Sequence, residues 1–341
     1  MTARILLIAL LAPLALGLSG ATVNAVEGTS NLYGAEDLVI SIIPENPGPD
    51  EGVTLDVKNF LTDISRAYIA WYVDGIRTVG GIGKTRFEFT TGSVGSRKTV
   101  RAVVETEEGR VLSRTLVFEP GDLDLLWEAN TYTPPFYRGK ALPSSESAVT
   151  VVAIPRFRNS LAGRPENTFY EWKQDGKKLL LESGLGKNTI TITSARLMGT
   201  TEISAVARTL DTGAVAEDSI KLVSVFPRVK LYEEAAISGT KYREALQGAF
   251  TLDGGEVALK VEPFYFSVND VKNESIEYLW RINAKEASFG KENQRVVVLR
   301  VPDQGRGGAS RITVEAKNTN NPLQFVKDSL TVTFIATPYA F

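Results

Sequence analysis

The side chains that most often carry out enzyme chemistry are missing from this chain. Among its 341 residues there is no Cys and no His. This excludes disulfides, Cys/His zinc sites and catalytic sets built on a thiolate or an imidazole. What remains is the chemistry of carboxylates, amines and aromatic rings. We therefore expect a protein that is not an enzyme and that carries no cofactor.

Acidic side chains come closest to forming a site, and three pairs lie near each other in sequence: Asp50-Glu51, Asp122 with Asp124, and Glu233-Glu234. Glycoside hydrolysis would need two carboxyl groups about 5–10 Å apart in a cleft, and no pair is marked for that role. Calcium would need about six to eight converging oxygens. Asp122 and Asp124 fall at a predicted domain joint, where calcium could stiffen the chain. The interpretation we favour is solvated acidic turns, so no metal site is predicted.

A Gly-Lys pair occurs three times, as Gly83-Lys84, Gly186-Lys187 and Gly290-Lys291. The first copy lies in a glycine-rich segment, Gly80 to Thr85, which could suggest a phosphate-binding loop. Such a loop needs Gly-x-x-x-x-Gly-Lys followed by Ser or Thr, between a strand and a helix. The segment lacks that spacing, so the pattern predicts turns in hairpins and no nucleotide site.

Aromatic side chains gather in one long insertion, residues 125–147, where Pro134 and Pro135 flank them. The candidate binding surface consists of Trp127, Tyr132, Phe136 and Tyr137. Large rigid rings could form a platform for a sugar or a partner protein. Alternatively, the rings pack over a domain edge or fill the joint between the first and second domains.

Three tryptophans mark a repeat in the elements around these side chains. Trp71, Trp172 and Trp280 lie about 100 residues apart, the length of one sandwich domain. An alternating strand precedes each, at 53–57, 149–153 and 257–261, and a Gly-Lys pair and three more strands follow. Period-2 alternation is typical of half-buried strands, so we expect the three tryptophans to be structural core anchors. The best helical candidate is short, at 242–248.

The segments Tyr68 to Gly75 and Tyr170 to Gly176 resemble the central strand and turn of immunoglobulin-like and PKD-like domains of bacterial exported surface proteins. The resemblance covers most of residues 37–336. It implies an all-β fold of three tandem immunoglobulin-like (PKD-like) β-sandwich domains after an N-terminal signal peptide. The chain departs from antibody domains in lacking the Cys pair around the Trp, and from the usual glycine-aspartate turn of PKD domains. Such folds host many functions.

The predicted domains cover residues 37–119, 122–227 (with the aromatic insertion 125–147) and 228–336. Short linkers that contain proline join them, Glu119-Pro120-Gly121 and Phe226-Pro227. Short joints of this kind restrict rotation between domains, so we expect a semi-rigid rod.

The N-terminus has the pattern of a secretory signal peptide in residues 1–25. Arg4 precedes an apolar run from Ile5 to Leu18, and small residues lead to a cleavage site after Ala25. The alternative is an uncleaved anchor, but the run is short for a ~20-residue span and Pro13 interrupts it. Residues 26–36 would be a mobile leader and 337–341 a tail. We expect an exported protein that is extracellular, on the cell surface or periplasmic.

These features together predict an exported, non-catalytic surface or envelope protein, a structural or adhesive rod that binds another protein or a surface. One alternative is a carbohydrate-binding protein that uses the aromatic insertion, and another is an accessory subunit of a pilus or secretion assembly. The partner would be a protein or a surface polysaccharide. With 38 basic and 40 acidic residues scattered along the chain, no nucleic-acid partner is expected. Membrane contact is expected only through the signal segment, if it stays uncleaved.

Overall fold

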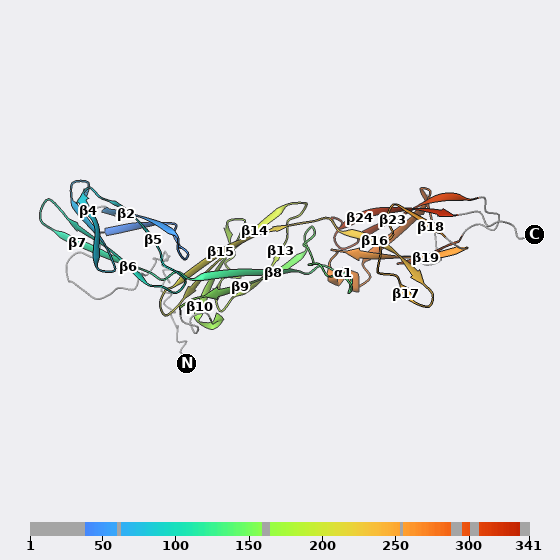
Figure 1. Cartoon of the computed structure of the whole chain (residues 1–341), viewed down its shortest axis with the longest axis horizontal. Coiled ribbons are helices and arrows are strands. Elements are labelled where there is room, and N and C mark those ends of the chain that lie inside the picture. The colour runs from blue at the N-terminus through green and yellow to red at the C-terminus, as the bar shows by residue number, and fades with distance from the viewer. Residues whose placement is uncertain are drawn as a thin grey trace, which may run out of the picture.

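The computed structural model describes residues 38–59, 63–158, 164–252, 255–287, 295–300 and 307–334. The predicted signal peptide 1–25, the leader 26–36 and the tail 337–341 lie outside these ranges, so they stay predictions. Within them the regular secondary structure is almost entirely β-strand, and the strands form three sheet pairs in a row along one axis (Figure 1). We refer to these pairs as the first, second and third sandwich.

The first sandwich comprises seven strands: β1 (Leu38–Ile43), β2 (Gly52–Asn59), β3 (Tyr68–Val73), β4 (Ile76–Ile82), β5 (Arg86–Thr90), β6 (Lys98–Glu105) and β7 (Val111–Phe118). One sheet has the order β1-β2-β5 and the other β4-β3-β6-β7. Alternate side chains of β2, such as Val53, Leu55 and Val57, are buried between the sheets. This is the period-2 pattern expected of a half-buried strand.

The second sandwich repeats this plan with β8 (Asp122–Ala129), β9 (Ala148–Arg156), β10 (Thr168–Gln174), β11 (Lys177–Lys178), β12 (Gly184–Leu185), β13 (Thr189–Thr193), β14 (Thr200–Thr209) and β15 (Val215–Val223). A single 3-10 turn, Pro165–Asn167, precedes β10. The sheets have the orders β13-β9-β8 and β11-β10-β14-β15, with β12 also paired to β10. Because 125–129 belong to β8, the segment between β8 and β9 covers 130–147.

The third sandwich comprises β16 (Arg228–Ala235), β17 (Gly239–Thr240), β18 (Ala249–Leu252), β19 (Glu256–Phe264), β20 (Ile276–Ile282), β21 (Lys285–Glu286), β22 (Val296–Arg300), β23 (Gly308–Asn318) and β24 (Phe325–Phe334), with helix α1 (Val268–Lys272) before β20. One sheet has the order β17-β16-β19-β22 and the other β18-β24-β23-β20-β21. Strand β18 pairs with β24 in parallel, whereas the other strands pair antiparallel.

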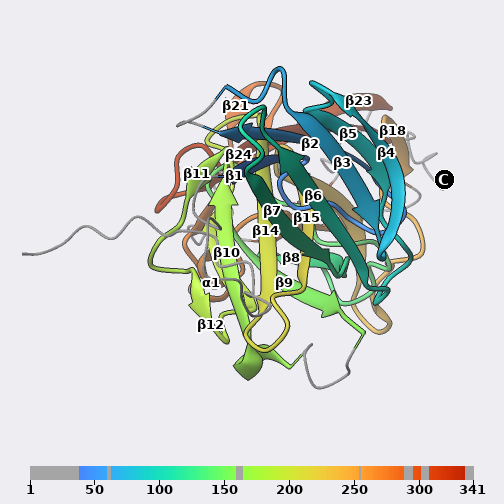
Figure 2. The same cartoon turned by 90° about the vertical axis from the view of Figure 1, so that its left-hand side faces the viewer.

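Each sandwich places its first two strands and a later strand in one sheet and the central Trp-bearing strand in the other. This is the immunoglobulin-like arrangement, so the expected all-β fold is confirmed. The PKD-like subtype and the exact domain boundaries stay predictions. The end-on view shows the strand layers of the three units stacked behind one another (Figure 2).

The segment 242–248, the best helical candidate in the sequence, is not helical. Tyr242 lies in a turn, and the backbone N–H of Leu246 donates to the carbonyl of Leu231 on β16 at 2.8 Å. Pairing with a neighbouring strand therefore decides the conformation of this short polar segment. Among the described residues α1 is the one α-helix, and no helix there is long or apolar enough to cross a membrane.

Candidate functional site

The three repeat tryptophans lie in three separate cores. Trp71 and Trp172 are 0% exposed and Trp280 is 3% exposed. Each belongs to the hydrophobic cluster of its own sandwich. They are therefore out of reach of any ligand, and a binding site would have to use other residues.

The predicted acidic pair Asp122 and Asp124 faces a cation from its own sheet. Both carboxylates on β8 form ion pairs with the guanidinium of Arg156, which lies opposite on β9. The hydrogen bonds that Arg156 donates to Asp122 and Asp124 raise its pKa. Arg156 thus supplies the positive charge that a calcium ion would bring to these two carboxylates.

Two members of the aromatic insertion pack against the third sandwich. The ring of Phe136 stacks on Tyr242, with centroids 4.0 Å apart, and meets Tyr232 edge-on at 5.6 Å. Tyr137 meets Phe264 edge-on at 5.5 Å. The insertion therefore fills the joint between the second and third sandwiches. The alternative considered from the sequence, that it fills the joint between the first and second domains, is wrong.

Tyr132 and Tyr137 continue this contact through backbone and hydroxyl groups. The backbone of Tyr132 donates to the carbonyl of Phe266 and accepts from the N–H of Tyr265, both at 2.7 Å. The hydroxyls of Tyr137 and Tyr265 lie 2.9 Å apart. Burial, with Tyr137 beside it, raises the pKa of Tyr265 to about 12. The insertion thus adds a short antiparallel pairing to the third sandwich.

Trp127 is the member of the candidate surface that does not join this cluster. It is half-buried on β8, and the ammonium of Lys140 lies 3.2 Å from its ring centroid. Desolvation in this position lowers the pKa of Lys140. The four predicted residues therefore do not form one continuous platform, because three face the third sandwich and one faces Lys140.

A buried polar network closes the same joint from another side. The side-chain amide of Gln324, which is 0% exposed, donates to the Ser144 hydroxyl at 3.1 Å and to the Ser145 carbonyl at 3.2 Å. Its oxygen accepts from the backbone of Ser267 and the amide of Asn318. Buried amides with partners on two units fix the relative position of those units.

A charged cluster lies behind the aromatic rings, centred on Glu262 of β19, which is 3% exposed. Its carboxylate accepts from the Tyr242 hydroxyl at 2.9 Å and pairs with Lys260 at 3.2 Å and Arg295 at 2.5 Å. Burial alone would lower the pKa of Arg295, but Glu262 together with Tyr278 and Tyr132 more than offsets this and raises it. The carboxylate is therefore saturated by neighbours and not presented to a ligand.

The joint between the first and second sandwiches is also built from direct contacts. Asn46 bridges the units, since its amide donates to Glu217 at 2.8 Å and its oxygen accepts from Arg208 at 2.7 Å. In the linker, the carbonyl of Pro120 accepts from Gly95 at 3.0 Å, and Gly121 donates to the carbonyl of Val215 at 2.9 Å. The linker is therefore bonded to both units.

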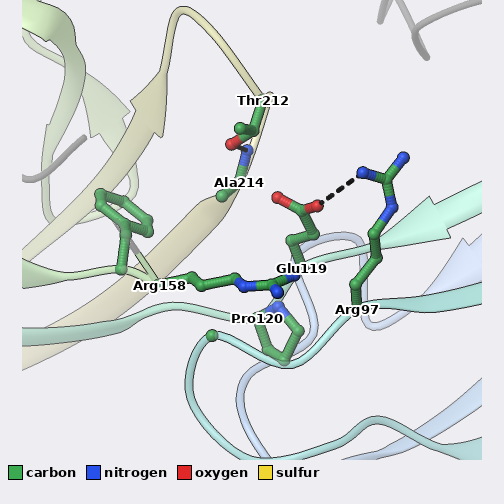
Figure 3. A pocket seen from close by; sticks show the side chains of 8 residues that line it. Arg97, Glu119, Pro120, Arg158, Thr212 and Ala214 are labelled. Atoms are coloured by element: carbon green, nitrogen blue, oxygen red, sulfur yellow. Dashed lines mark hydrogen bonds and ion pairs between the residues drawn. The ribbon is translucent and has the colours of Figure 1, made fainter. Parts of the chain in front are cut away.

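A small recess opens at this joint (Figure 3). It encloses about 160 Å³ and is lined by residues of both sandwiches and the linker, among them Arg97, Glu119, Arg158 and Thr212. Arg97 and Glu119 pair at 3.4 Å, which neutralises two of its charges. Organic ligands usually occupy pockets of about 300–1,000 Å³, so this recess is too small for one.

The sequence does not predict the polar side chains that build both joints. Asn46 and Gln324 are single polar residues in loops, and nothing near them in sequence marks their partners more than a hundred positions away. The aromatic rings of the insertion were the one available signal. The described structure thus offers two locked joints as its distinctive feature, and among these residues no group of three or more acidic side chains is placed to hold a metal ion.

Comparison with known proteins adds little to this. No known family model and no curated protein sequence matches the chain. Among solved structures it is similar to the fibronectin(III)-like modules of Clostridium thermocellum CbhA, at 14% identity over 55% of this chain and 94% of that one, with a TM-score of 0.26. It is also similar to the central fibronectin-III array of RIM-binding protein, at 11% identity over 89% and 99% with a TM-score of 0.28. The immunoglobulin-like fold rests on the strand pairing of the chain itself.

Proposed function

We propose that this chain is an exported, non-catalytic rod that holds binding surfaces at a fixed spacing in the cell envelope or at the cell surface. The observation that carries the proposal is the pair of locked joints. Each joint combines backbone hydrogen bonds with side-chain contacts between neighbouring sandwiches. A flexible string of modules would need none of these contacts.

The joint between the second and third sandwiches supports the proposal most strongly. Eighteen residues, 130–147, connect β8 to β9 in the second sandwich, and this segment contacts the third sandwich. Phe136 stacks on Tyr242, and Gln324 holds Ser144 in a buried network. Aromatic stacking and the hydrogen bonds of a buried amide both resist bending at this joint. A bend would expose apolar rings and break the hydrogen bonds of the amide.

The carbohydrate alternative has less support. The ring of Phe136 is covered on one side by Tyr242, and Tyr137 is turned edge-on to Phe264. A sugar platform needs open ring faces side by side. The pilus or secretion-assembly role remains compatible with a rod, and it would be one setting in which the proposed rod acts.

Small-angle X-ray scattering on the purified full chain tests the rod. The expected result is a maximum dimension that matches three sandwiches end to end and does not change with salt. A Phe136→Ala/Gln324→Ala variant should broaden the distance distribution, whereas Val111→Ala, an exposed side chain at the end of β7 that lies opposite to the linker, should not. Equal, broad distributions for all three proteins would contradict a rigid rod.

Export is tested separately by cell fractionation with mass-spectrometric mapping of the N-terminus. We expect a mature chain that starts at Val26 in an extracellular or envelope fraction. A chain that keeps Met1 and fractionates with the cytosol would overturn the proposed location while leaving the stiffness of the rod untouched.

A further inference from the structure

The most exposed pair of adjacent leucines in the described residues lies on a loop of the second sandwich. Leu180 is 78% exposed and Leu181 is 85% exposed, in the turn between β11 and β12. In the end-on view this turn lies at the outer side of the rod (Figure 2). Exposing two neighbouring leucines to water costs free energy, so their exposure suggests a binding partner that covers them.

The loop is held firmly in this position. Leu179 packs against the core, and its N–H donates to the carbonyl of Trp172 at 2.8 Å. The Ser183 hydroxyl accepts from the N–H of Trp172 at 2.9 Å and donates to the Leu179 carbonyl at 2.7 Å. Since both ends of the turn are tied to one core residue, the next two leucines must project outward.

The surroundings of the two leucines are basic. Lys177 and Lys178 precede them on exposed positions, and the ammonium of Lys187 donates to the carbonyl of Leu181. The acidic groups nearby are Glu171, which pairs with Lys178 at 3.1 Å, Glu182, and Asp175, whose carboxylate accepts from the N–H of Glu202 at 2.9 Å. From 177 to 187 the three lysines and one glutamate leave an excess of two positive charges.

More apolar surface lies beside the turn. Phe169 on β10 and Leu185 on β12 are cross-strand partners, and they are 40% and 52% exposed. The pattern is an apolar tip and flank with lysines at its base. Lysines near an apolar surface favour the boundary between acyl chains and anionic headgroups, where the stem is buried and the ammonium meets phosphate.

We propose that the loop Lys177–Lys187 docks on an anionic phospholipid bilayer, with Leu180 and Leu181 inserted below the headgroups. A second copy of the chain is a less favoured partner for this loop than a bilayer. A stable protein interface needs about 800 Å² per partner, and this tip is only a few side chains wide. A bilayer takes up isolated leucines without a complementary surface. The inference goes beyond the proposed rod and does not depend on it.

The absence of cysteine allows a local test on the full chain. Leu180→Cys, labelled with the polarity-sensitive dye NBD, is mixed with vesicles of phosphatidylcholine containing phosphatidylglycerol. We expect a blue shift and a several-fold rise in emission, weakened by salt and by Lys177→Glu/Lys178→Glu. Because the dye reports the tip alone, membrane binding through residues 1–25 does not produce this signal.

Ile237→Cys is the matched control. Ile237 is fully exposed on the turn between β16 and β17, but Glu233 and Glu234 lie near it in sequence. We expect no shift there. The unlabelled variant Leu180→Ser/Leu181→Ser should have a vesicle partition coefficient about tenfold lower than that of the wild-type protein. Its melting temperature should equal that of the wild type.

Three outcomes would overturn the proposal. One is the absence of a shift at position 180, and another is an equal shift with pure phosphatidylcholine. The third is a shift without vesicles that grows with protein concentration, which would assign the loop to contact between copies of the chain. Scattering data on the rod are unaffected by any of these results.

Discussion

The indole N–H of Trp172 donates a hydrogen bond to the backbone carbonyl of Lys187 at 2.8 Å. Trp71 makes the same bond to Lys84 at 2.9 Å. The preceding glycines, Gly83 and Gly186, have φ values of 66° and 75°, which turn the chain so that the following carbonyl points into the core. In the first two sandwiches the Gly-Lys pair therefore positions the carbonyl that the buried tryptophan binds, and the third pair, Gly290-Lys291, lies outside the described residues.

Replacing Trp172 with Phe should destabilise the second sandwich by about 2–3 kcal/mol, because it opens a cavity and leaves the Lys187 carbonyl without its donor. Calorimetry, which resolves sandwiches that melt separately, measures the effect. Trp127→Phe is the control, and it should cost about 1 kcal/mol or less since that ring is half-exposed. Equal losses for both variants would contradict a special role of the indole bond.

Gly95 tests the joint between the first and second sandwiches. Its φ is 73°, and an added Cβ would lie 2.8 Å from the Cα of Arg158 in the neighbouring sandwich. Gly109 has a φ of 78° but open space around it. Both substitutions to Ala carry the backbone penalty of about 1 kcal/mol, and only Gly95→Ala should also widen the distance distribution in scattering. Identical scattering from the two variants would show that the joint is not locked there.

A turn that clamps two strands recurs in every sandwich. In the first two, the oxygens of Asp74 and Asp175 accept from the N–H groups of Thr99 and Glu202 at 2.8 and 2.9 Å. In the third, Asn283 accepts from Arg311 at 2.9 Å. The position that follows the polar residue has a positive φ in all three copies.

This turn predicts a stabilising substitution. The third copy has Ala284 at a φ of 69°, where the first two have Gly75 and Gly176. Ala284→Gly should raise the stability of the third sandwich by about 0.5–1 kcal/mol by removing left-handed strain. Gly176→Ala should lower the stability of the second by a similar amount. Thermal melting of both variants checks the sign, and a loss for Ala284→Gly would contradict the argument.

Gln324 should be needed for more than packing. Gln324→Leu keeps the size of the side chain but removes the hydrogen bonds of its amide to the Ser144 hydroxyl, the Ser267 N–H and the Asn318 amide. We expect a loss of about 2–3 kcal/mol in the unfolding free energy, measured with urea. Gln174→Leu, whose amide bonds one carbonyl at the surface, should change it by less than about 0.5 kcal/mol.

The alkaline limit of stability should depend on Tyr278, since burial raises its pKa to about 12. A raised pKa means that the fold favours the neutral phenol. Its contribution is complete below the unfolded value of about 10 and is lost as the pH rises from there through about 12. Absorbance titration at 295 nm should show a late phase that loses one tyrosine in Tyr278→Phe. An unchanged late phase would assign it to other tyrosines, Tyr265 first.

The fold could be predicted from the sequence because its signals are local and repeated. Strand alternation such as Val53, Leu55 and Val57 depends on side chains two positions apart. The turns need glycine or a small polar residue at fixed offsets from each Trp. The local pattern is weak at 242–248, and this best helical candidate is not helical because Leu246 bonds to Leu231 on the neighbouring strand.

By itself the sequence determined the class of elements, the repeat and the exclusion of thiol and imidazole chemistry. Only the tertiary structure decided which face each side chain meets. Phe136 stacks on Tyr242, Gln324 donates a hydrogen bond to Ser144, and Leu180 is exposed to water. The physical reason is that contacts between distant residues depend on how whole sandwiches are placed relative to each other. No short stretch of the sequence contains a pattern that records this placement.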